Sequence, residues 1–337
     1  MKAVVCIEPH QIMVEERALP QAKAGEALVR IRRIGLCGTD YHIYSGRHPY
    51  LSYPRVMGHE LSGEIVEVRE GSSFRRGQLV AINPYLACGQ CIACRKGKPN
   101  ACVHIRVLGV HADGGMAEFL LVPEAALIDA EGLSVDEAAM LEFLAIGAHA
   151  VARSAHAPED RILVVGAGPI GIAAALFARL NGAHITLMDT SASRLNYAQT
   201  HLGFDEIAPV DGNMSDAMAG RTNGEMFDVV FDATGSLEAM ARSLDYVAHG
   251  GKLVFVGVAS GDVILSDPEF HKRETTLIAS RNALGADFER VKHAILDGLL
   301  PVRALHTHSF DVQDMPHRLP ELIDGADHVL KAIARFE

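Results

Sequence analysis

The stretch Arg161-Ile-Leu-Val-Val-Gly-Ala-Gly-Pro-Ile-Gly171 decides the fold of this 337-residue chain. Its apolar part is typical of a buried strand, and a helix over residues 170–180 is expected directly after the glycines. Gly166 permits a tight turn, Gly168 lets the backbone approach a pyrophosphate, and Gly171 lets helix and strand pack closely. The free N–H groups at the helix N-terminus favour phosphate. The stretch therefore predicts a dinucleotide-binding βαβ unit.

A carboxylate stands 18 residues past Gly171, at the end of the next expected strand. Asp189 can bind both ribose hydroxyls there, and its charge would repel a 2′-phosphate, so we expect NAD rather than NADP. Arg194 leaves NADP binding as an alternative, because an arginine at this place can tolerate the 2′-phosphate. The same arginine can also pack on the adenine. The residues predicted to bind the coenzyme are Gly166, Gly168, Pro169, Ile170, Gly171, Asp189, Arg194, Thr234 and Val258.

Strands and helices alternate in the middle of the chain. Strands expected over 161–165, 184–188, 227–231 and 252–256, with helices over 170–180 and 237–247, predict parallel βαβ units and a doubly wound sheet. The first 145 residues instead carry short β-branched runs between glycine-bearing turns, which is an all-β pattern. A helix over 287–299 and a strand over 330–336 follow. We expect an α/β protein with a Rossmann domain over 146–284 and a discontinuous, mostly-β domain over 1–145 and 285–337; a separate C-terminal domain is the alternative.

Four of the six cysteines fall within fifteen residues, with the spacing C-x2-C-x2-C-x7-C. Four thiolates aimed at one centre suit a structural Zn²⁺, and a lobe of turns without its own core needs such a metal to be ordered. A disulfide pair is a weaker reading, because nothing else indicates an oxidising compartment. An iron–sulfur cluster is the main rival, although its usual run closes with x3 and a proline. The predicted structural zinc ligands are Cys88, Cys91, Cys94 and Cys102.

A second, open metal site is predicted from scattered residues. Cys37 ends an early strand, His59 and Glu60 follow about twenty residues later, and Glu142 stands between apolar neighbours. An unpaired buried carboxylate is costly, and a metal ion removes that cost. One thiolate, one imidazole and one carboxylate, with water in the fourth position, is the composition of a catalytic zinc site.

These motifs and their order resemble the medium-chain zinc-dependent alcohol dehydrogenases along the whole chain, within their polyol, threonine and sugar-acid branch. The stretches that carry the resemblance are Cys37-Gly-Thr-Asp40, Gly58-His-Glu60, the cysteine quartet and the glycine turn. The family implies a GroES-like catalytic domain with a zinc lobe at about 84–104, a catalytic zinc held by Cys37, His59 and Glu142, and Glu60 as a second-shell or exchanging ligand. One departure is that Phe143 follows Glu142, where the family usually has proline.

The resemblance also implies a reaction and its proton path. A zinc-polarised substrate hydroxyl would lose its proton to Thr39, and His42 would deliver it to solvent while NAD takes the hydride. A structural role for His42 near a turn is the alternative. For the substrate we look to Arg281, His111 and Arg47, in a cleft between the domains. An arginine can bind a carboxylate through two parallel hydrogen bonds, which favours a sugar acid over a polyol or L-threonine.

Composition limits the partners. The net charge of −11 would repel a nucleic-acid backbone. No apolar run has membrane-spanning length and the start is unlike a leader, so we expect a cytoplasmic protein without nucleic-acid or membrane partners. The resemblance implies a homodimer or homotetramer formed through an edge strand, expected at 252–256. A non-catalytic NAD-binding sensor is the alternative of another class, although every candidate metal residue is present.

Overall fold

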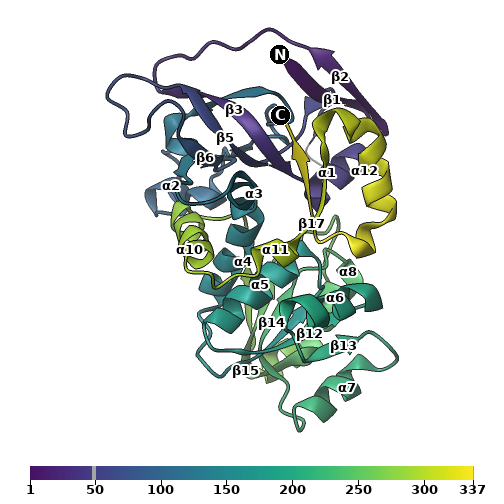
Figure 1. The fold of residues 1–337 in the computed structure, drawn as a ribbon. Coiled ribbons are helices and arrows are strands. Elements are labelled where there is room, and N and C mark those ends of the chain that lie inside the picture. Colours follow the sequence, from purple (N-terminus) through teal and green to yellow (C-terminus); the bar gives the residue numbers. More distant parts are fainter. Residues whose placement is uncertain (48–50, 337) are drawn as a thin grey trace. The chain divides into compact units, whose positions relative to one another are not determined.

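The computed structural model describes residues 1–47 and 51–336 (Figure 1). The chain divides into two compact units, one of Met1–Phe143 with Ala283–Glu337 and one of Leu144–Asn282. The sequence analysis placed these boundaries at residues 145 and 284. None of the helices in the described part of the chain is both long and apolar enough to cross a membrane.

The first unit is built on β-sheets. Its seven-stranded mixed sheet has the order β10-β6-β5-β3-β18-β17, and β9 also pairs with β3. These strands are β3 (Glu26–Gly35), β5 (Glu60–Glu67), β6 (Leu79–Ile82), β9 (Phe119–Pro123), β10 (Leu127–Asp129), β17 (His306–Asp311) and β18 (Lys331–Arg335). Smaller sheets contain β1 (Lys2–Glu8), β2 (Gln11–Glu16) and β4 (Arg55–Val56), and β7 (Tyr85–Leu86) with β8 (Arg106–Val107). Apolar residues of β1, β3, β5 and β6 form much of its buried core.

The end of the chain completes the sheet of the first unit. Strand β18 pairs antiparallel with β3, so that Ile333 faces Gly35 in register. The C-terminal segment, yellow in Figure 1, thereby lies beside a strand from the first tenth of the chain. The fold is discontinuous, as predicted, rather than followed by a separate C-terminal domain. The helices of this unit are α1 (Gly38–Tyr44), α2 (Ile92–Arg95), α3 (Val135–Ala139), α10 (Gly285–Leu296), α11 (Val302–Leu305) and α12 (Met315–Asp324), and α4 (Leu141–Ser154) runs across the boundary.

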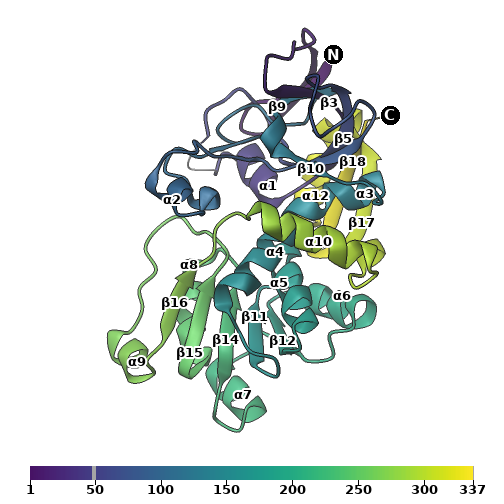
Figure 2. The ribbon, with the colours of Figure 1, turned by 90° about the vertical axis from the view of Figure 1, so that its left-hand side faces the viewer.

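The second unit is a doubly wound parallel sheet with the order β13-β12-β11-β14-β15-β16 (Figure 2). The order reverses at β11, which is the topological switch point of a Rossmann fold and the place where dinucleotides bind. The strands are β11 (Arg161–Val165), β12 (His184–Asp189), β13 (Ile207–Pro209), β14 (Phe227–Asp232), β15 (Val247–Phe255) and β16 (Thr276–Ala279). The helices are α5 (Pro169–Leu180), α6 (Ala192–Leu202), α7 (Met214–Arg221), α8 (Leu237–Arg242) and α9 (Asp267–Lys272).

Two local expectations for this unit are wrong. The helix expected over 237–247 ends at Arg242 and continues as a 3₁₀ turn, Ser243–Tyr246. The buried hydroxyl of Ser243 donates to Oδ2 of Asp232 at 2.7 Å, which ties this turn to the end of β14. The strand around 252–256 is not an edge strand, because β15 pairs with both β14 and β16. Among the described strands, β16 forms that edge of the sheet.

Candidate functional site: two metal centres and a dinucleotide turn

Cys37 lies where β3 passes into α1, and a buried carboxylate fixes its loop. Asp40 is fully buried. Its Oδ2 accepts a hydrogen bond from the backbone N–H of Cys37 at 3.0 Å, and its Oδ1 accepts one from the N–H of Gly58 at 3.3 Å. One carboxylate therefore joins the cysteine loop to the loop that carries His59. Because supporting groups of this kind orient metal ligands, Asp40 belongs to the site although it is no ligand candidate.

His59 is held by a glycine turn and is buried. Gly58 has a φ of +91°, a conformation that a residue with a side chain rarely adopts. Nδ1 of His59 lies 3.9 Å from Oδ1 of Asp40 and has no hydrogen-bond partner among the described residues. Burial lowers the pKa of His59, but Asp40, Cys37 and Glu142 raise it more strongly, so that it ends well above the ordinary value. The groups around this ring thus stabilise a positive charge at its position, as the groups around a bound cation do.

Glu60 directly follows His59 and is paired with a buried lysine. Its two carboxylate oxygens accept hydrogen bonds from Nζ of Lys331 at 2.7 and 2.6 Å. Burial raises the pKa of Glu60, while Lys331 opposes that effect. The two direct hydrogen bonds from the ammonium group stabilise the ionised form of this carboxyl group. Burial outweighs this pairing and raises the pKa of Glu60 to about 7, with Lys331 directly beside the carboxyl group as its partner inside the first unit.

Glu142 lies at the start of α4 and is buried too. Its Oε1 accepts a hydrogen bond from the hydroxyl of Tyr85. Burial, followed by the charge of Glu142, raises the pKa of Tyr85 well above its ordinary value. The phenol therefore stays protonated and donates a hydrogen bond to the carboxylate. Glu142 thus has a neutral partner where Glu60 has a charged one.

These side chains fit a zinc ion. A sulfur of Cys37, a ring nitrogen of His59 and a carboxylate oxygen of Glu60 lie within 4.8 Å of one another. Glu142 is outside that group, but its charge acts on both His59 and Glu60. The donor set of sulfur, nitrogen and carboxylate oxygen is the one that zinc takes in catalytic sites, and the buried, unpartnered Nδ1 of His59 fits a ring held by a metal. The assignment of Glu142 as third ligand stays a prediction.

The four clustered cysteines form the second metal centre. Their sulfurs lie within 4.8 Å of one another, with 3.4 Å between those of Cys91 and Cys94 and 3.8 Å between those of Cys91 and Cys102. None of the described cysteines forms a disulfide. Backbone N–H groups of Cys94 and Val103 lower the pKa of the Cys91 thiol to about 6. A thiolate is the form that binds metal, so this geometry fits a structural zinc.

The predicted dinucleotide turn has the required backbone. Gly166 has a φ of +98°, and a Cβ on Gly171 would lie 1.8 Å from the carbonyl oxygen of Gly166. A Cβ on Gly168 would meet nothing within 4 Å, so its missing side chain leaves open space before the N-terminus of α5. Pro169 occupies the first turn of that helix, where no N–H is needed, and Ile170 follows it half-buried. These glycines leave room for a pyrophosphate at the helix N-terminus.

Asp189 ends β12 beside this turn. Its Oδ2 accepts from the N–H of Ala167 at 2.6 Å and its Oδ1 from the N–H of Ser191 at 2.7 Å, which orients the carboxylate. Nη1 of Arg194 lies 4.0 Å from Oδ2. Farther along, the Thr234 hydroxyl donates to Oδ1 of Asp232 at 2.7 Å, and Val258 exposes 82% of its surface. An exposed apolar side chain on a loop after a parallel strand suits contact with a flat ring.

Comparison with known proteins identifies the family. The family model "Alcohol dehydrogenase GroES-like domain" matches residues 23–132, and the model "Zinc-binding dehydrogenase" matches residues 169–296. The chain belongs to the zinc-binding alcohol dehydrogenases. The family predicted from the motifs is thereby confirmed, and the dehydrogenase is an oxidoreductase that acts on CH–OH donors.

Individual relatives match over the full length. L-galactonate-5-dehydrogenase of Escherichia coli is 39% identical, covering 100% of this chain and 99% of its own. The sorbitol dehydrogenase of Bacillus subtilis is 32% identical over 99% of this chain and 96% of its own. The crystal structure of the rspB alcohol dehydrogenase of E. coli CFT073, complexed with NADH, has a TM-score of 0.93 at 30% identity, covering 100% of this chain and 99% of that one.

The three residues predicted to bind substrate are all exposed. Arg47 is exposed just after α1, and Arg281 is exposed two residues after β16, in the second unit. His111 is exposed in the first unit, where its Nδ1 accepts a hydrogen bond from the N–H of Val107 at 3.2 Å. The role of these three residues in the dehydrogenase stays a prediction.

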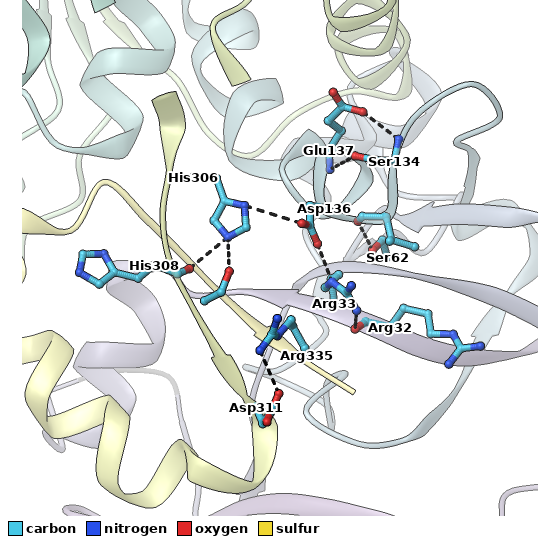
Figure 3. A network of polar contacts seen from close by, with 12 residues as sticks. Arg32, Arg33, Ser62, Ser134, Asp136, Glu137, His306, His308, Asp311 and Arg335 are labelled. Atoms are coloured by element: carbon cyan, nitrogen blue, oxygen red, sulfur yellow. Dashed lines mark hydrogen bonds and ion pairs between the residues drawn. The ribbon is translucent and has the colours of Figure 1, made fainter. Parts of the chain in front are cut away.

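A surface cavity of about 290 Å³ in the first unit also gathers arginines. It is lined by Arg32, Arg33, Glu64, Val135, Arg335 and Phe336. Figure 3 shows how two carboxylates meet these guanidinium groups: Arg33 contacts Asp136 at 2.5 Å and Arg335 contacts Asp311 at 3.3 Å. Arg32 contacts Glu64 at 2.9 Å. Because each arginine is matched by a carboxylate, this cavity does not have the excess positive charge that a sugar-acid site needs.

Sequence reasoning missed three residues around the catalytic metal: Asp40, Tyr85 and Lys331. Asp40 was quoted as part of a motif without a role. Lys331 carried a signal, because a lysine in the apolar strand Leu330-Lys-Ala-Ile-Ala334 must be either exposed or paired. Tyr85 carried no such signal, because a tyrosine just before the cysteine lobe is not unusual in a sequence.

Proposed function

We propose that this dehydrogenase oxidises a secondary alcohol of a small sugar acid, an aldonate such as L-galactonate, and uses NAD. The observation that carries the substrate class is the 39% identity to L-galactonate-5-dehydrogenase over the whole chain. NAD is supported by the oriented carboxylate of Asp189, which would repel a 2′-phosphate. Arg281 supports an acid, because a guanidinium binds a carboxylate through two parallel hydrogen bonds.

In this proposal Cys37, His59 and Glu142 hold the catalytic zinc and Glu60 stands beside it. When bound, zinc supplies Lewis-acid polarisation of the substrate hydroxyl, and NAD supplies the hydride acceptor. Asp40 keeps the loops of Cys37 and His59 together through its two backbone hydrogen bonds. Tyr85 orients Glu142 by donating a hydrogen bond from its hydroxyl to the carboxylate.

The chain also has residues that can move the hydroxyl proton outward. Thr39 is half-buried and His42 is exposed, and they stand three residues apart on α1, so they occupy neighbouring positions on one face of that helix. Partial loss of water around the ring, together with the charge of Arg47, lowers the pKa of His42. The imidazole is therefore neutral at pH 7 and able to accept a proton.

A spectrophotometric screen for NADH formation tests the proposed function. With zinc-loaded protein, we expect aldonates to give the highest kcat/KM in a panel of aldonates, polyols and L-threonine. A clear preference for sorbitol-like polyols would replace the sugar acid, and the 32% identity to sorbitol dehydrogenase makes polyols the second candidate. No NADH formation with any substrate, while zinc is bound, would favour a non-catalytic sensor.

Asp189→Asn is expected to weaken the discrimination against NADP. The amide keeps an acceptor oxygen for the turn but removes the charge that repels the 2′-phosphate. Loss of a charge-assisted hydrogen bond of about 2 kcal/mol to the ribose should raise KM for NAD roughly 10- to 100-fold, whereas KM for NADP should fall. The comparison variant is Asp228→Asn, whose carboxylate accepts from the N–H of Arg161 in the same unit. Equal shifts in both variants would contradict a coenzyme role for Asp189.

His42→Ala is expected to change the pH dependence of alcohol oxidation. A neutral imidazole accepts the proton, so the wild-type rate should fall as the pH drops below the lowered pKa of His42. The variant should lose this acidic limb and react about 10²-fold more slowly at pH 7, the low end for acid–base catalysis because water can replace a relay. The control is His317→Ala, an exposed histidine on α12. An unchanged rate and profile would leave His42 with a structural role only.

A further inference from the structure

Asp232, the last residue of β14, is a fully buried acid to which the proposed reaction gives no role. Its Oδ1 accepts hydrogen bonds from the backbone N–H of Thr234 at 2.9 Å and from the Thr234 hydroxyl at 2.7 Å. Its Oδ2 accepts one from the hydroxyl of Ser243 at 2.7 Å. Burial raises the pKa of Asp232, and the hydrogen bonds from these two residues oppose the rise by stabilising the carboxylate. The side chain is therefore held in one orientation, with both bonds to Oδ1 coming from the loop after β14.

The hydroxyl of Thr234 is fully used inside this loop. It donates its one proton to Asp232, and its oxygen accepts a hydrogen bond from the backbone N–H of Ser236 at 3.1 Å. The methyl group of Thr234 contacts the dinucleotide turn, because a Cβ on Gly166 would lie 3.2 Å from Cγ2 of Thr234. Thr234 thus joins the buried carboxylate to the first glycine of the turn that is predicted to receive the pyrophosphate.

The loop after β15 is fixed to the same residue. The backbone carbonyl oxygen of Asp232 accepts hydrogen bonds from the N–H groups of Val256 at 2.8 Å and Gly257 at 3.0 Å. A Cβ on Gly257 would lie 2.5 Å from the backbone nitrogen of Gly235, and a Cβ on Gly235 would lie 3.1 Å from the carbonyl oxygen of Val258. The loops after β14 and β15 therefore touch backbone to backbone, so a shift of one loop displaces the other.

Three connections at one edge of the parallel sheet are involved. Strand β14 pairs in parallel with both β11 and β15, so the loops that follow these strands lie at the same, carboxyl-terminal edge. This edge is where dinucleotides bind in such sheets. Gly166, Thr234 and Val258 are all predicted to bind the coenzyme, and each lies on one of the three loops. Asp232 bonds to or backs all three loops.

We propose that Asp232 is a positioning residue for the coenzyme: its carboxylate holds the Thr234 loop against Gly166 and against the loop of Val258, so that the coenzyme surface is formed before binding. A preformed surface avoids the cost of ordering loops when the ligand binds. Without the carboxylate the loop occupies other conformations, and the apparent Kd rises as the competent fraction falls. The inference rests on the coenzyme site of the proposed function, but not on its substrate or on the choice between NAD and NADP.

The test is a fluorescence titration of zinc-loaded protein with NADH in the absence of substrate. Asp232→Asn keeps the shape of the side chain and removes the charge that strengthens both bonds from Thr234. The Kd for NADH should rise about tenfold, as expected when about a tenth of the protein keeps the competent loop. At saturating NAD the kcat should change less than about threefold, because a loss of uniform binding raises KM alone. An unchanged Kd for NADH would overturn the proposal.

Ser243→Ala is the matched control, because it removes the hydrogen bond to Oδ2 of the same carboxylate and leaves both bonds to the Thr234 loop. It should lower the melting temperature by a few degrees, as the loss of a buried hydrogen bond does. The Kd for NADH should change less than about threefold, because the competent loop stays populated. Equal increases of Kd in Ser243→Ala and Asp232→Asn would mean that the carboxylate only supports the fold.

A pair of changes at Thr234 separates positioning from direct contact with the coenzyme. Thr234→Val keeps a methyl group for Gly166 but removes the hydroxyl, whereas Thr234→Ser keeps the hydroxyl that donates to Asp232. We expect Thr234→Ser to bind NADH at least about threefold more tightly than Thr234→Val, the effect of one hydrogen bond. In the Asp232→Asn background Thr234→Val should weaken binding by less than about twofold, because the two changes remove the same interaction.

Fully additive effects of Thr234→Val and Asp232→Asn would show that Thr234 contacts the coenzyme independently and would overturn the proposal. If Asp232→Asn does not fold, the Thr234 pair still decides, since equal binding of NADH by both Thr234 variants contradicts a role for the hydroxyl. A negative substrate screen leaves these results unaffected, because NADH binding is read without substrate. Wild-type protein that bound no NADH would instead contradict the coenzyme of the proposed function, and this inference with it.

Discussion

We expect Cys37→Ser to yield a folded dehydrogenase that has lost its turnover. Cys37 supplies the thiolate of the predicted catalytic site, and a serine hydroxyl does not ionise at pH 7 to replace it. Loss of metal polarisation worth several kcal/mol corresponds to a fall in kcat of at least about 10³-fold. Cys37 is half-buried at the start of α1, and Asp40 still caps its backbone, so we expect the melting temperature to change by only a few degrees.

Three measurements check this expectation: kcat on the best substrate, zinc per chain, and the melting temperature. Zinc should fall from about two ions per chain to about one, because the cysteine lobe keeps its own. The matched control is Cys6→Ala, which removes a fully buried cysteine of the same unit far in sequence from both metal centres. Burial raises the pKa of that thiol to about 11, so Cys6 is a protonated core residue and its loss should leave the zinc content at two. Turnover that survives Cys37→Ser with one zinc per chain would contradict the catalytic site.

The sequence predicted the fold because its strongest patterns are local. The glycine turn is nearly determined by sterics, since a Cβ on Gly171 would lie 1.8 Å from the backbone of Gly166. The cysteine spacing similarly allows few arrangements other than a metal lobe. Boundaries were less certain: the strand expected at 330–336 is Lys331–Arg335, and α8 ends five residues early because Ser243 bonds to Asp232.

The supporting groups of the catalytic site could not be predicted from local patterns. Lys331 is 271 residues from Glu60, and their contact exists only because β18 returns to pair with β3. The pairing of Tyr85 with Glu142 likewise joins segments 57 residues apart. Such contacts depend on sheet register over long separations, which a single sequence does not encode in a readable way. The edge strand was missed for the same reason, since β15 and β16 are equally apolar candidates until the strand order is known.

Cys91→Ser should damage the protein in the opposite way to Cys37→Ser. The sulfur of Cys91 lies 3.4 Å from that of Cys94 and 3.8 Å from that of Cys102, and it accepts a hydrogen bond from the N–H of Val103 at 3.5 Å. The lobe has little core of its own, with Ile92 56% and Val103 65% exposed. Without zinc the lobe has almost nothing to hold it, because binding a structural metal is what folds such segments.

We expect Cys91→Ser to lose one zinc per chain and roughly 3 kcal/mol of stability, which lowers the melting temperature of the first unit, with its roughly 200 residues, by about 6 to 12 °C. The exposed Arg95 and Lys96 should then become sites of rapid tryptic cleavage, which mass spectrometry of the fragments detects. Turnover measured before cleavage at low temperature should stay within about tenfold of wild type, because the predicted catalytic ligands remain. Lys96→Ala with the cysteines intact controls for the loss of a cleavage site alone. The two cysteine variants must therefore differ in both readings: if Cys37→Ser and Cys91→Ser gave the same turnover and the same melting temperature, the two zinc centres would not have the separate roles assigned to them.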